Sequence, residues 1–296
     1  MKKKKSLRGL LHWAKKTMKK KRNVAVVYWL LRLSVIAIMV AQFFNHNFEN
    51  VFLCVLTLVL LLMPTIMERR LKIDLPNALE IIIMLFIYAA EIMGEIQAFY
   101  TTYRGWDTML HTMNGFLCAA IGFCLVDLFD RSEKSSLSLS PKYMAIVAFC
   151  FSMTVGVLWE FFECAMDQLL FLDMQKDTVV NTISTVMLDP AGGNKPQIIR
   201  GITDVILVTD QGEISLGLGG YLDIGLLDTM KDLFVNFIGA VVFSVTGFFY
   251  ARSKGERRTP AQNFVPSKKT EETDYLRQAR ERSQALSQQE AEPEEK

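Results

Sequence analysis

The stretch DTMLHTMNGFLCAAIGFCLVDLF, residues 107–129, begins with polar groups and continues as a long apolar run. A helix needs ~20 predominantly apolar residues to cross the hydrocarbon core of a bilayer, and this stretch has that length. Positions three and four apart align on a helix, so Asp107, His111 and Asn114 are expected on one face. The stretch therefore predicts a membrane helix that starts with a carboxylate, an imidazole and an amide side by side.

Several other stretches have the same apolar character, and 51% of all residues are hydrophobic. A soluble protein of this length would not need so many unbroken apolar runs. The fold class predicted is an all-α membrane protein, a six-helix transmembrane bundle with a small β-rich extracytoplasmic loop region. The six helices are expected at residues 24–44, 51–67, 77–99, 107–129, 143–170 and 228–250.

Lys and Arg gather on one side of this predicted bundle. They are abundant in residues 1–23, in the turns at 68–76 and 130–142, and at the start of residues 252–296. Cytoplasmic segments of membrane proteins carry this excess of positive charge. We therefore expect both termini in the cytoplasm and the long loop at residues 171–227 on the opposite side of the membrane.

The terminal segments differ in character from the spans at 24–170 and 228–251. Residues 1–23 have apolar residues at helical spacing beneath many lysines, which favours a basic amphipathic segment on the inner leaflet. A basic tail that only sets the topology fits the same pattern. Residues 252–296 are charged and have few large apolar side chains, which predicts a disordered cytoplasmic tail.

The loop at residues 171–227 contains turn and strand signals. DPAGGN at 189–194 is rich in turn-forming residues. VILVT, DQGE and ISLGLGG follow one another over residues 205–220 and read as a β-hairpin. We expect a small β-rich cap over the helical bundle.

Ionisable side chains inside the predicted spans are the main functional signal, because each costs several kcal/mol in a bilayer unless it is paired or hydrated. Nine polar residues on four helices form the predicted chamber: Glu91, Asp107, His111, Asn114, Glu160, Glu163, Asp228, Asp232 and Asn236. Counted at 1.5 Å per residue from the outer helix ends, four of them fall roughly 5–10 Å below the outer boundary: Glu91, His111, Glu163 and Asp232. The sequence therefore predicts one acidic chamber that opens outward.

Carboxylates packed this closely repel one another unless a cation lies among them, and no Arg or Lys is expected at their level. We predict a divalent metal with His111, Glu163 and Asp232 as ligands. The expected catalytic residues are Glu160, Glu163 and Asp107, with Glu160 or Glu163 as the base. The rival interpretation is that the acids share protons and bind no metal.

Three motifs carry a resemblance to known families: W-D-x-x-x-H-x-x-x-G from Trp106, W-E-x-x-E from Trp159, and D-T-x-x-D-x-x-x-N-x-x-G from Asp228. Over roughly residues 80–250 the chain resembles the YjdF-like family of bacterial inner-membrane proteins, which has no established activity. It is similar, more distantly, to VanZ-like membrane proteins, which are linked to glycopeptide resistance. The resemblance implies a multi-pass protein of the bacterial cytoplasmic (plasma) membrane.

Three classes of function fit these features. The first is a hydrolase or transferase that acts on a lipid or lipid-linked envelope substrate of the outer leaflet. The second is a proton- or ion-linked carrier, although the inner halves of the helices have few acids. The third is a non-catalytic envelope protein with a polar structural core. Membrane lipid is the expected partner in each class, and no nucleic-acid partner is expected.

Overall fold

The computed structural model describes residues 22–71, 73–130, 139–253, 264 and 267–268. The predicted amphipathic segment at 1–23 lies outside the described residues except at its end. Most of the predicted tail at 252–296 lies outside them as well.

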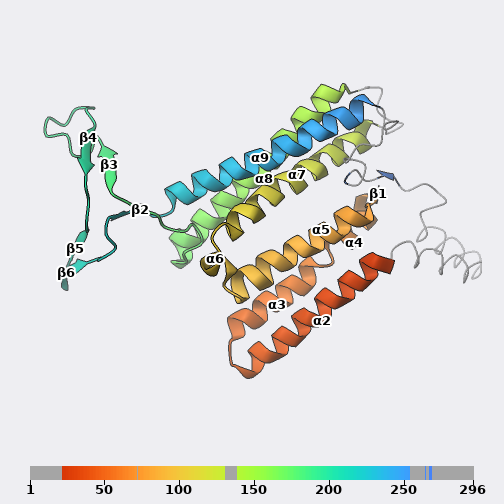
Figure 1. The fold of residues 1–296 in the computed structure, drawn as a ribbon, viewed down its shortest axis with the longest axis horizontal. Coiled ribbons are helices and arrows are strands. Elements are labelled where there is room, and N and C mark those ends of the chain that lie inside the picture. Colours follow the sequence, from red (N-terminus) through yellow and green to blue (C-terminus); the bar gives the residue numbers. More distant parts are fainter. Residues whose placement is uncertain (1–21, 72, 131–138, 254–263, 265–266, 269–296) are drawn as a thin grey trace, which may run out of the picture.

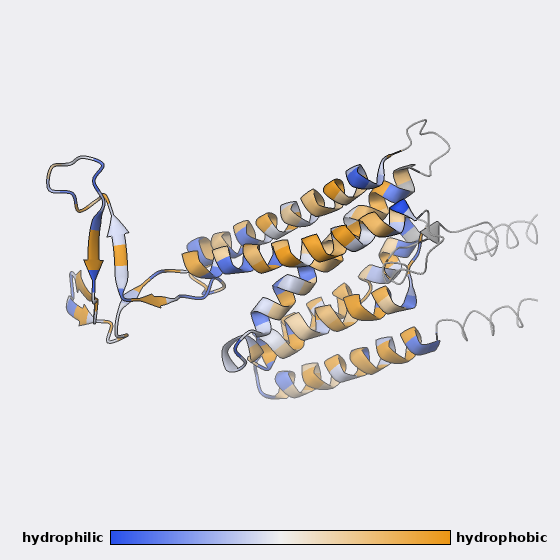
Figure 2. Cartoon of the chain, turned by 45° about the horizontal axis from the view of Figure 1, so that its top comes forward, coloured by the Kyte–Doolittle hydropathy of each residue, from blue (hydrophilic) through white to orange (hydrophobic). Residues whose placement is uncertain are grey.

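The described chain is mostly helical. Five helical segments are long and apolar enough to cross a membrane: Arg22–Phe44, Phe48–Glu68, Trp106–Asp127, Pro141–Leu170 and Leu226–Arg252. Hydrophobic residues run along most of their length, and polar residues gather toward their ends (Figure 2). The predicted membrane class is therefore confirmed.

The first half of the chain forms a layer of helices on one side of the molecule (Figure 1). Its elements are α2 (Arg22–Phe44), α3 (Phe48–Leu60), α4 (Met63–Leu71), α5 (Asn77–Tyr88), η1 (Ala89–Ile96) and α6 (Phe99–Thr102). Asn47 is the N-cap residue of α3, and its side chain accepts a hydrogen bond from the backbone N–H of Asn50.

The expected straight helix at 77–99 differs from the structure. The α-helical geometry of α5 ends at Tyr88, η1 continues as a wider π-helix to Ile96, and Ala98 takes a positive φ of 56° before α6. The ring of Tyr100 from α6 packs against Gly94, where a Cβ would lie 2.3 Å from that ring. This segment is not among the five spans above.

The second half forms a three-helix group of α7 (Trp106–Asp130), α8 (Pro141–Leu170) and α9 (Leu226–Arg252). Ser140 is the N-cap residue of α8, and its side chain accepts a hydrogen bond from the backbone N–H of Tyr143. Pro141 occupies the first helical position. The group is held by a core of small and aromatic side chains: Ala119, Ala120, Phe123, Met144, Ala148, Ala240 and Phe243.

A hairpin arm, residues 179–222, connects α8 to α9. It pairs β2 (Val179–Val180) with β7 (Tyr221–Leu222), β3 (Thr182–Thr185) with β4 (Gln197–Arg200), and β5 (Ile206–Thr209) with β6 (Gly212–Ser215), all antiparallel. The β5–β6 hairpin confirms the prediction for residues 205–220. The backbone N–H of Gly192 donates to the carbonyl of Asp189, which confirms the turn at 189–194. The arm extends away from the helices and does not cover them as expected (Figure 1).

Part of the expected C-terminal tail packs on the helices. The ring centroids of Phe264 and Phe116 lie 5.0 Å apart. Phe264 also contacts two apolar clusters on α5, α7, α8 and α9. Strand β8 (Ser267–Lys268) pairs with β1 (Ile73–Asp74). An aromatic side chain in a charged segment gains burial only after the helices have formed a surface for it.

Candidate functional site

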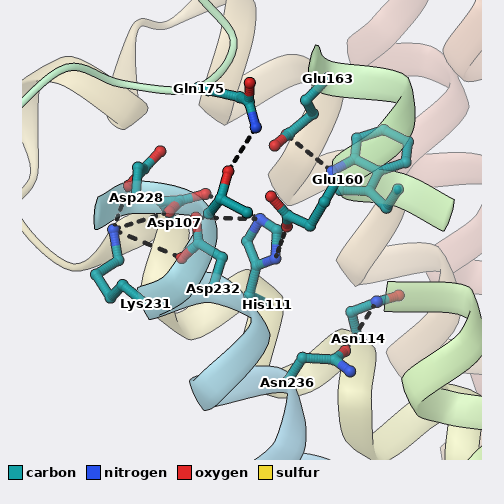
Figure 3. A network of polar contacts seen from close by, with 12 residues as sticks. Asp107, His111, Asn114, Glu160, Glu163, Gln175, Asp228, Lys231, Asp232 and Asn236 are labelled. Atoms are coloured by element: carbon teal, nitrogen blue, oxygen red, sulfur yellow. Dashed lines mark hydrogen bonds and ion pairs between the residues drawn. The ribbon is translucent and has the colours of Figure 1, made fainter. Parts of the chain in front are cut away.

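The candidate site lies at the end of the three-helix group where α8 ends and α9 begins (Figure 3). We use the name polar cluster for its six residues from three helices: Asp107 and His111 of α7, Glu160 of α8, and Asp228, Lys231 and Asp232 of α9. The helices meet closely here because glycines line their contact. A Cβ on Gly115 would lie 2.0 Å from the carbonyl oxygen of Asn236.

His111 lies at the centre of the polar cluster. Its Nε2 is 3.3 Å from Oδ1 of Asp107 and 3.9 Å from Oδ2 of Asp232. Its Nδ1 is 3.8 Å from Oε1 of Glu160. These distances exceed the usual N–H···O range of 2.7–3.2 Å, so the ring faces three carboxylates without a tight hydrogen bond to any of them.

Three of these residues have the geometry of a metal-binding group. One ligand atom each from Asp107, His111 and Asp232 lies within 4.8 Å of the others. Two donors on one ion at about 2.1 Å lie at most about 4.2 Å apart, so small side-chain movements would let all three reach one cation. The group combines one imidazole with two carboxylates, a donor set that suits divalent transition metals.

Two carboxylate oxygens at the cluster are buried without a hydrogen-bond partner among the described residues: Oε2 of Glu160 and Oδ1 of Asp232. Glu160 is 4% exposed and Asp232 is 1% exposed. A buried acceptor without a partner costs about 1–3 kcal/mol, and a charged one costs more. A cation, a proton or a water molecule at these oxygens would remove that cost.

The expectation that no Lys or Arg lies at this level is wrong. Nζ of Lys231 lies 2.6 Å from Oδ1 of Asp228, 3.4 Å from Oδ2 of Asp107 and 3.5 Å from Oδ1 of Asp232. Neighbouring helix residues point about 100° apart, so the backbone of Lys231 lies off the face that Asp232 occupies. Its long side chain bends back to that face. The i,i+3 spacing from Asp228 is the sequence signal that could have found it.

The structure brings a different carboxylate to the ligand group from the one expected. Glu163 was predicted to bind the metal with His111 and Asp232, whereas Asp107 is the residue within reach of both. Oε1 of Glu163 instead accepts a 2.8 Å hydrogen bond from Nε1 of Trp159. The tryptophan of the W-E-x-x-E motif therefore orients the second glutamate, one turn away on the same helix.

The two predicted amides lie beneath the cluster and bind each other. Nδ2 of Asn114 donates to Oδ1 of Asn236 at 3.2 Å, and Nδ2 of Asn236 lies 3.7 Å from Sδ of Met153. Gly156 leaves room for this amide, since a Cβ there would lie 2.7 Å from Nδ2 of Asn236. The pair forms a packed floor below the polar cluster.

The arrangement of glycines, acids and amides over three helices falls within a region that matches a known family. Residues 27–253 match the family described as "Predicted membrane protein (DUF2238)". The chain belongs to this DUF2238 family. No curated protein and no solved structure matches the chain. The likeness to YjdF-like and VanZ-like proteins remains a resemblance.

The DUF2238 match contains the polar cluster and also the hairpin arm at residues 179–222. The segment that leads into the arm contacts the cluster. Oδ2 of Asp228 accepts a 2.9 Å hydrogen bond from the backbone N–H of Lys176, and Nε2 of Gln175 donates to Oγ1 of Thr229. The sequence did not indicate these contacts, because they join residues more than fifty positions apart.

Glu91 was also predicted to lie in the chamber. Among the described residues, no contact links Glu91 to the polar cluster. It lies on η1, and its carboxylate interacts electrostatically with Glu95. Tyr100 lies within electrostatic range of Glu91, Asp107 and Glu163.

Proposed function

We propose that the chain is a six-span protein of the bacterial cytoplasmic membrane that binds a divalent cation in its polar cluster. With this cation it hydrolyses or transfers a group on a lipid or lipid-linked envelope substrate of the outer leaflet. Both termini lie in the cytoplasm and the hairpin arm lies outside. The span that completes the six is α5 continued by η1, which at the α-helical rise of 1.5 Å per residue would reach at most about 30 Å, the thickness of the hydrocarbon core.

The observation that carries this proposal is the group of Asp107, His111 and Asp232, with ligand atoms within 4.8 Å of one another. Buried oxygens of Glu160 and Asp232 there have no hydrogen-bond partner among the described residues, and Nζ of Lys231 lies 3.5 Å from that of Asp232. At least three carboxylates here face a single imidazole, so a cation among them would offset their repulsion. Mg²⁺, Mn²⁺, Zn²⁺ and Fe²⁺ all accept such oxygen and nitrogen donors.

The residues around the cation have distinct tasks in this proposal. A bound divalent cation would supply Lewis acidity and an activated water molecule. Glu160 has a free buried oxygen at the cluster and would accept a proton from the attacking group. Glu163 is held by Trp159 and serves as the reserve base. Lys231 has a side chain 45% exposed at the rim and would attract an anionic substrate.

A second candidate rests on the same lysine. Lys231 lies within 3.5 Å of three carboxylates and neutralises part of their charge without any metal. In that case the remaining acids share protons, and the cluster serves a proton-linked carrier or a structural core. Metal content distinguishes the two accounts.

Elemental analysis of protein purified without chelators tests the proposal. The wild type should retain stoichiometric divalent metal, and Asp232→Asn should lose it. Glu163→Gln should retain metal, with affinity weakened by at most ~10–100-fold, because Glu163 lies outside the ligand group. Asp204→Asn in the hairpin arm is the matched control and should bind as the wild type does. Folded wild type without bound metal would favour the proton-sharing cluster.

A further inference from the structure

An apolar cavity of about 300 Å³ lies between α5, α7 and α9. Its lining includes Ile82 of α5, Met113 and Phe116 of α7, and Val242 of α9. Cavities that hold small molecules in proteins begin at about this volume. The cavity is partly open, and it lies along segments that are apolar enough to span a membrane. Two of the lining helices, α7 and α9, are among these segments.

The cavity begins at the level of the polar cluster. Thr112, which follows His111 in α7, is one of its lining residues, and Gly239 of α9 is another. The carbonyl of Thr112 is the atom that a Cβ on Gly239 would meet at 2.0 Å. The close contact of α7 and α9 thus lies at the end of the cavity nearest to the cluster.

One face of α9 connects the cavity with the cationic rim of the cluster. Lys231 and Val242 are eleven residues apart in the sequence. Their side chains therefore point in directions that differ by about 20° around the helix axis, and they lie about 16 Å apart along it. Val235 and Ile238 occupy the same face between them, and Ile238 is exposed. A chain lying along this face would run from a partly exposed ammonium group into an apolar cavity.

Phe264 lies at the part of the cavity further from the polar cluster. Phe264 lines the cavity, and its ring lies 5.0 Å from that of Phe116. The carbonyl of Phe264 lies 3.9 Å from Sγ of Cys124, further along α7. Two packed aromatic side chains, Phe116 and Phe264, therefore line this part of the cavity.

We propose that this cavity holds one acyl chain of an outer-leaflet phospholipid whose phosphate lies at Lys231. This inference rests on the proposed function and deepens it, because it names the substrate class that the polar cluster would receive. An acyl chain matches the apolar lining and the limited volume, and a phosphate matches the ammonium group at the rim. The distance from Lys231 to Val242 then corresponds to the upper part of the acyl chain.

Photo-crosslinking of the full chain in vesicles tests the proposal. The vesicles contain phosphatidylglycerol with a trace of the same lipid carrying a diazirine on one acyl chain. Peptide mapping should find adducts concentrated on Met113, Phe116 and Val242. Val242→Trp fills the cavity and should lower labelling of the α7 peptide by about tenfold, the effect of losing ~1.4 kcal/mol of binding.

The matched control is Val55→Trp on α3, because Val55 is 47% exposed and Val242 is 50% exposed, but Val55 does not line the cavity. It should leave labelling unchanged. Equal labelling of α2, α3 and α7 that Val242→Trp does not alter would overturn the proposal. Displacement of the label by a polyprenyl phosphate, with no displacement by unlabelled phosphatidylglycerol, would overturn it too.

Metal content is measured on the same samples. This measurement distinguishes failure of the proposed metal site from failure of the proposed acyl-chain site. Specific labelling of a metal-free wild type would leave a lipid site without the proposed chemistry. Stoichiometric metal without specific labelling would retain the metal site and remove the acyl-chain site. Lys231→Gln should weaken labelling by the anionic probe more than labelling by a diazirine phosphatidylcholine of zero net charge.

Discussion

Gly115 packs directly against the backbone of Asn236: a Cβ on Gly115 would lie 2.0 Å from that carbonyl oxygen. The contact is reciprocal one turn further along, where a Cβ on Gly239 would lie 2.0 Å from the carbonyl oxygen of Thr112. Small residues allow such close approach of helices in membranes. The two glycines hold α7 against α9, which places His111 within 3.9 Å of Asp232.

Gly115→Ala should therefore destabilise the protein and disturb the site. The added methyl group forces α7 and α9 apart, at a cost of about 1–3 kcal/mol that exceeds the ~1 kcal/mol gained in helix propensity. Thermal unfolding in detergent measures the loss. Gly247→Ala is the control, because the atoms nearest to its Cβ would be side-chain atoms of Phe123 at 3.1 Å and Phe243 at 3.4 Å rather than a backbone carbonyl at 2.0 Å. Equal melting temperatures for the two variants would contradict the proposed role of the contact.

Lys231→Gln distinguishes the two accounts of the polar cluster. If a divalent cation occupies the group of Asp107, His111 and Asp232, removal of the nearby ammonium should retain or tighten metal binding, because one like charge is lost. If Lys231 is the main counter-charge, the variant should instead lose stability by about 1–3 kcal/mol, because buried carboxylates are left without it. Calorimetric titration with Mn²⁺ and thermal unfolding measure the two effects. Weaker Mn²⁺ binding in the variant would count against the metal account.

The proposed topology predicts which residues a membrane-impermeant thiol reagent can reach. Gly192→Cys in the hairpin arm should react in intact cells. Ser253→Cys, which follows the basic end of α9, should react only after the membrane is permeabilised. The wild type, with its five native cysteines, gives the background labelling. Reaction of Ser253→Cys in intact cells would overturn the proposed orientation.

The hairpin arm should lose local stability in acid. The carboxylate of Asp204 accepts hydrogen bonds from the Ser215 hydroxyl and the backbone N–H groups of Val205 and Gly217, and these bonds lower its pKa. A lowered folded pKa stabilises the arm above the unfolded value of about 3.9, and this stability is lost as the pH falls through the folded pKa.

Hydrogen exchange of the Gly217 amide, corrected for its intrinsic rate, measures this loss between about pH 5 and pH 2.5. Protection should fall over that window in the wild type. Asp204→Asn should have low protection that changes little with pH. A wild type that keeps full protection at the acidic end would show that the carboxylate does not stabilise the hairpin.

Local patterns in the sequence were sufficient for much of this protein. The apolar run after Asp107 predicted α7, and the turn residues at 189–194 and 205–220 predicted two hairpin connections. The matched depth of His111 and Asp232 on separate helices predicted one shared chamber, and Nε2 of His111 lies 3.9 Å from Oδ2 of Asp232. It did not indicate Asp107 as the third member of the group. These features depend on length, periodicity and rise per residue, which act within one element or through a shared membrane boundary.

Tertiary structure alone decided which groups touch. Lys231 reaches three carboxylates and Glu163 turns to Trp159, because the rotation and spacing of α7 and α9 set which side chains come within a few ångströms. The packing of the helices also leaves the cavity that Phe264 lines, and the hairpin arm extends away from the helices. Such contacts depend on distances between elements far apart in the chain, and no local periodicity encodes those distances.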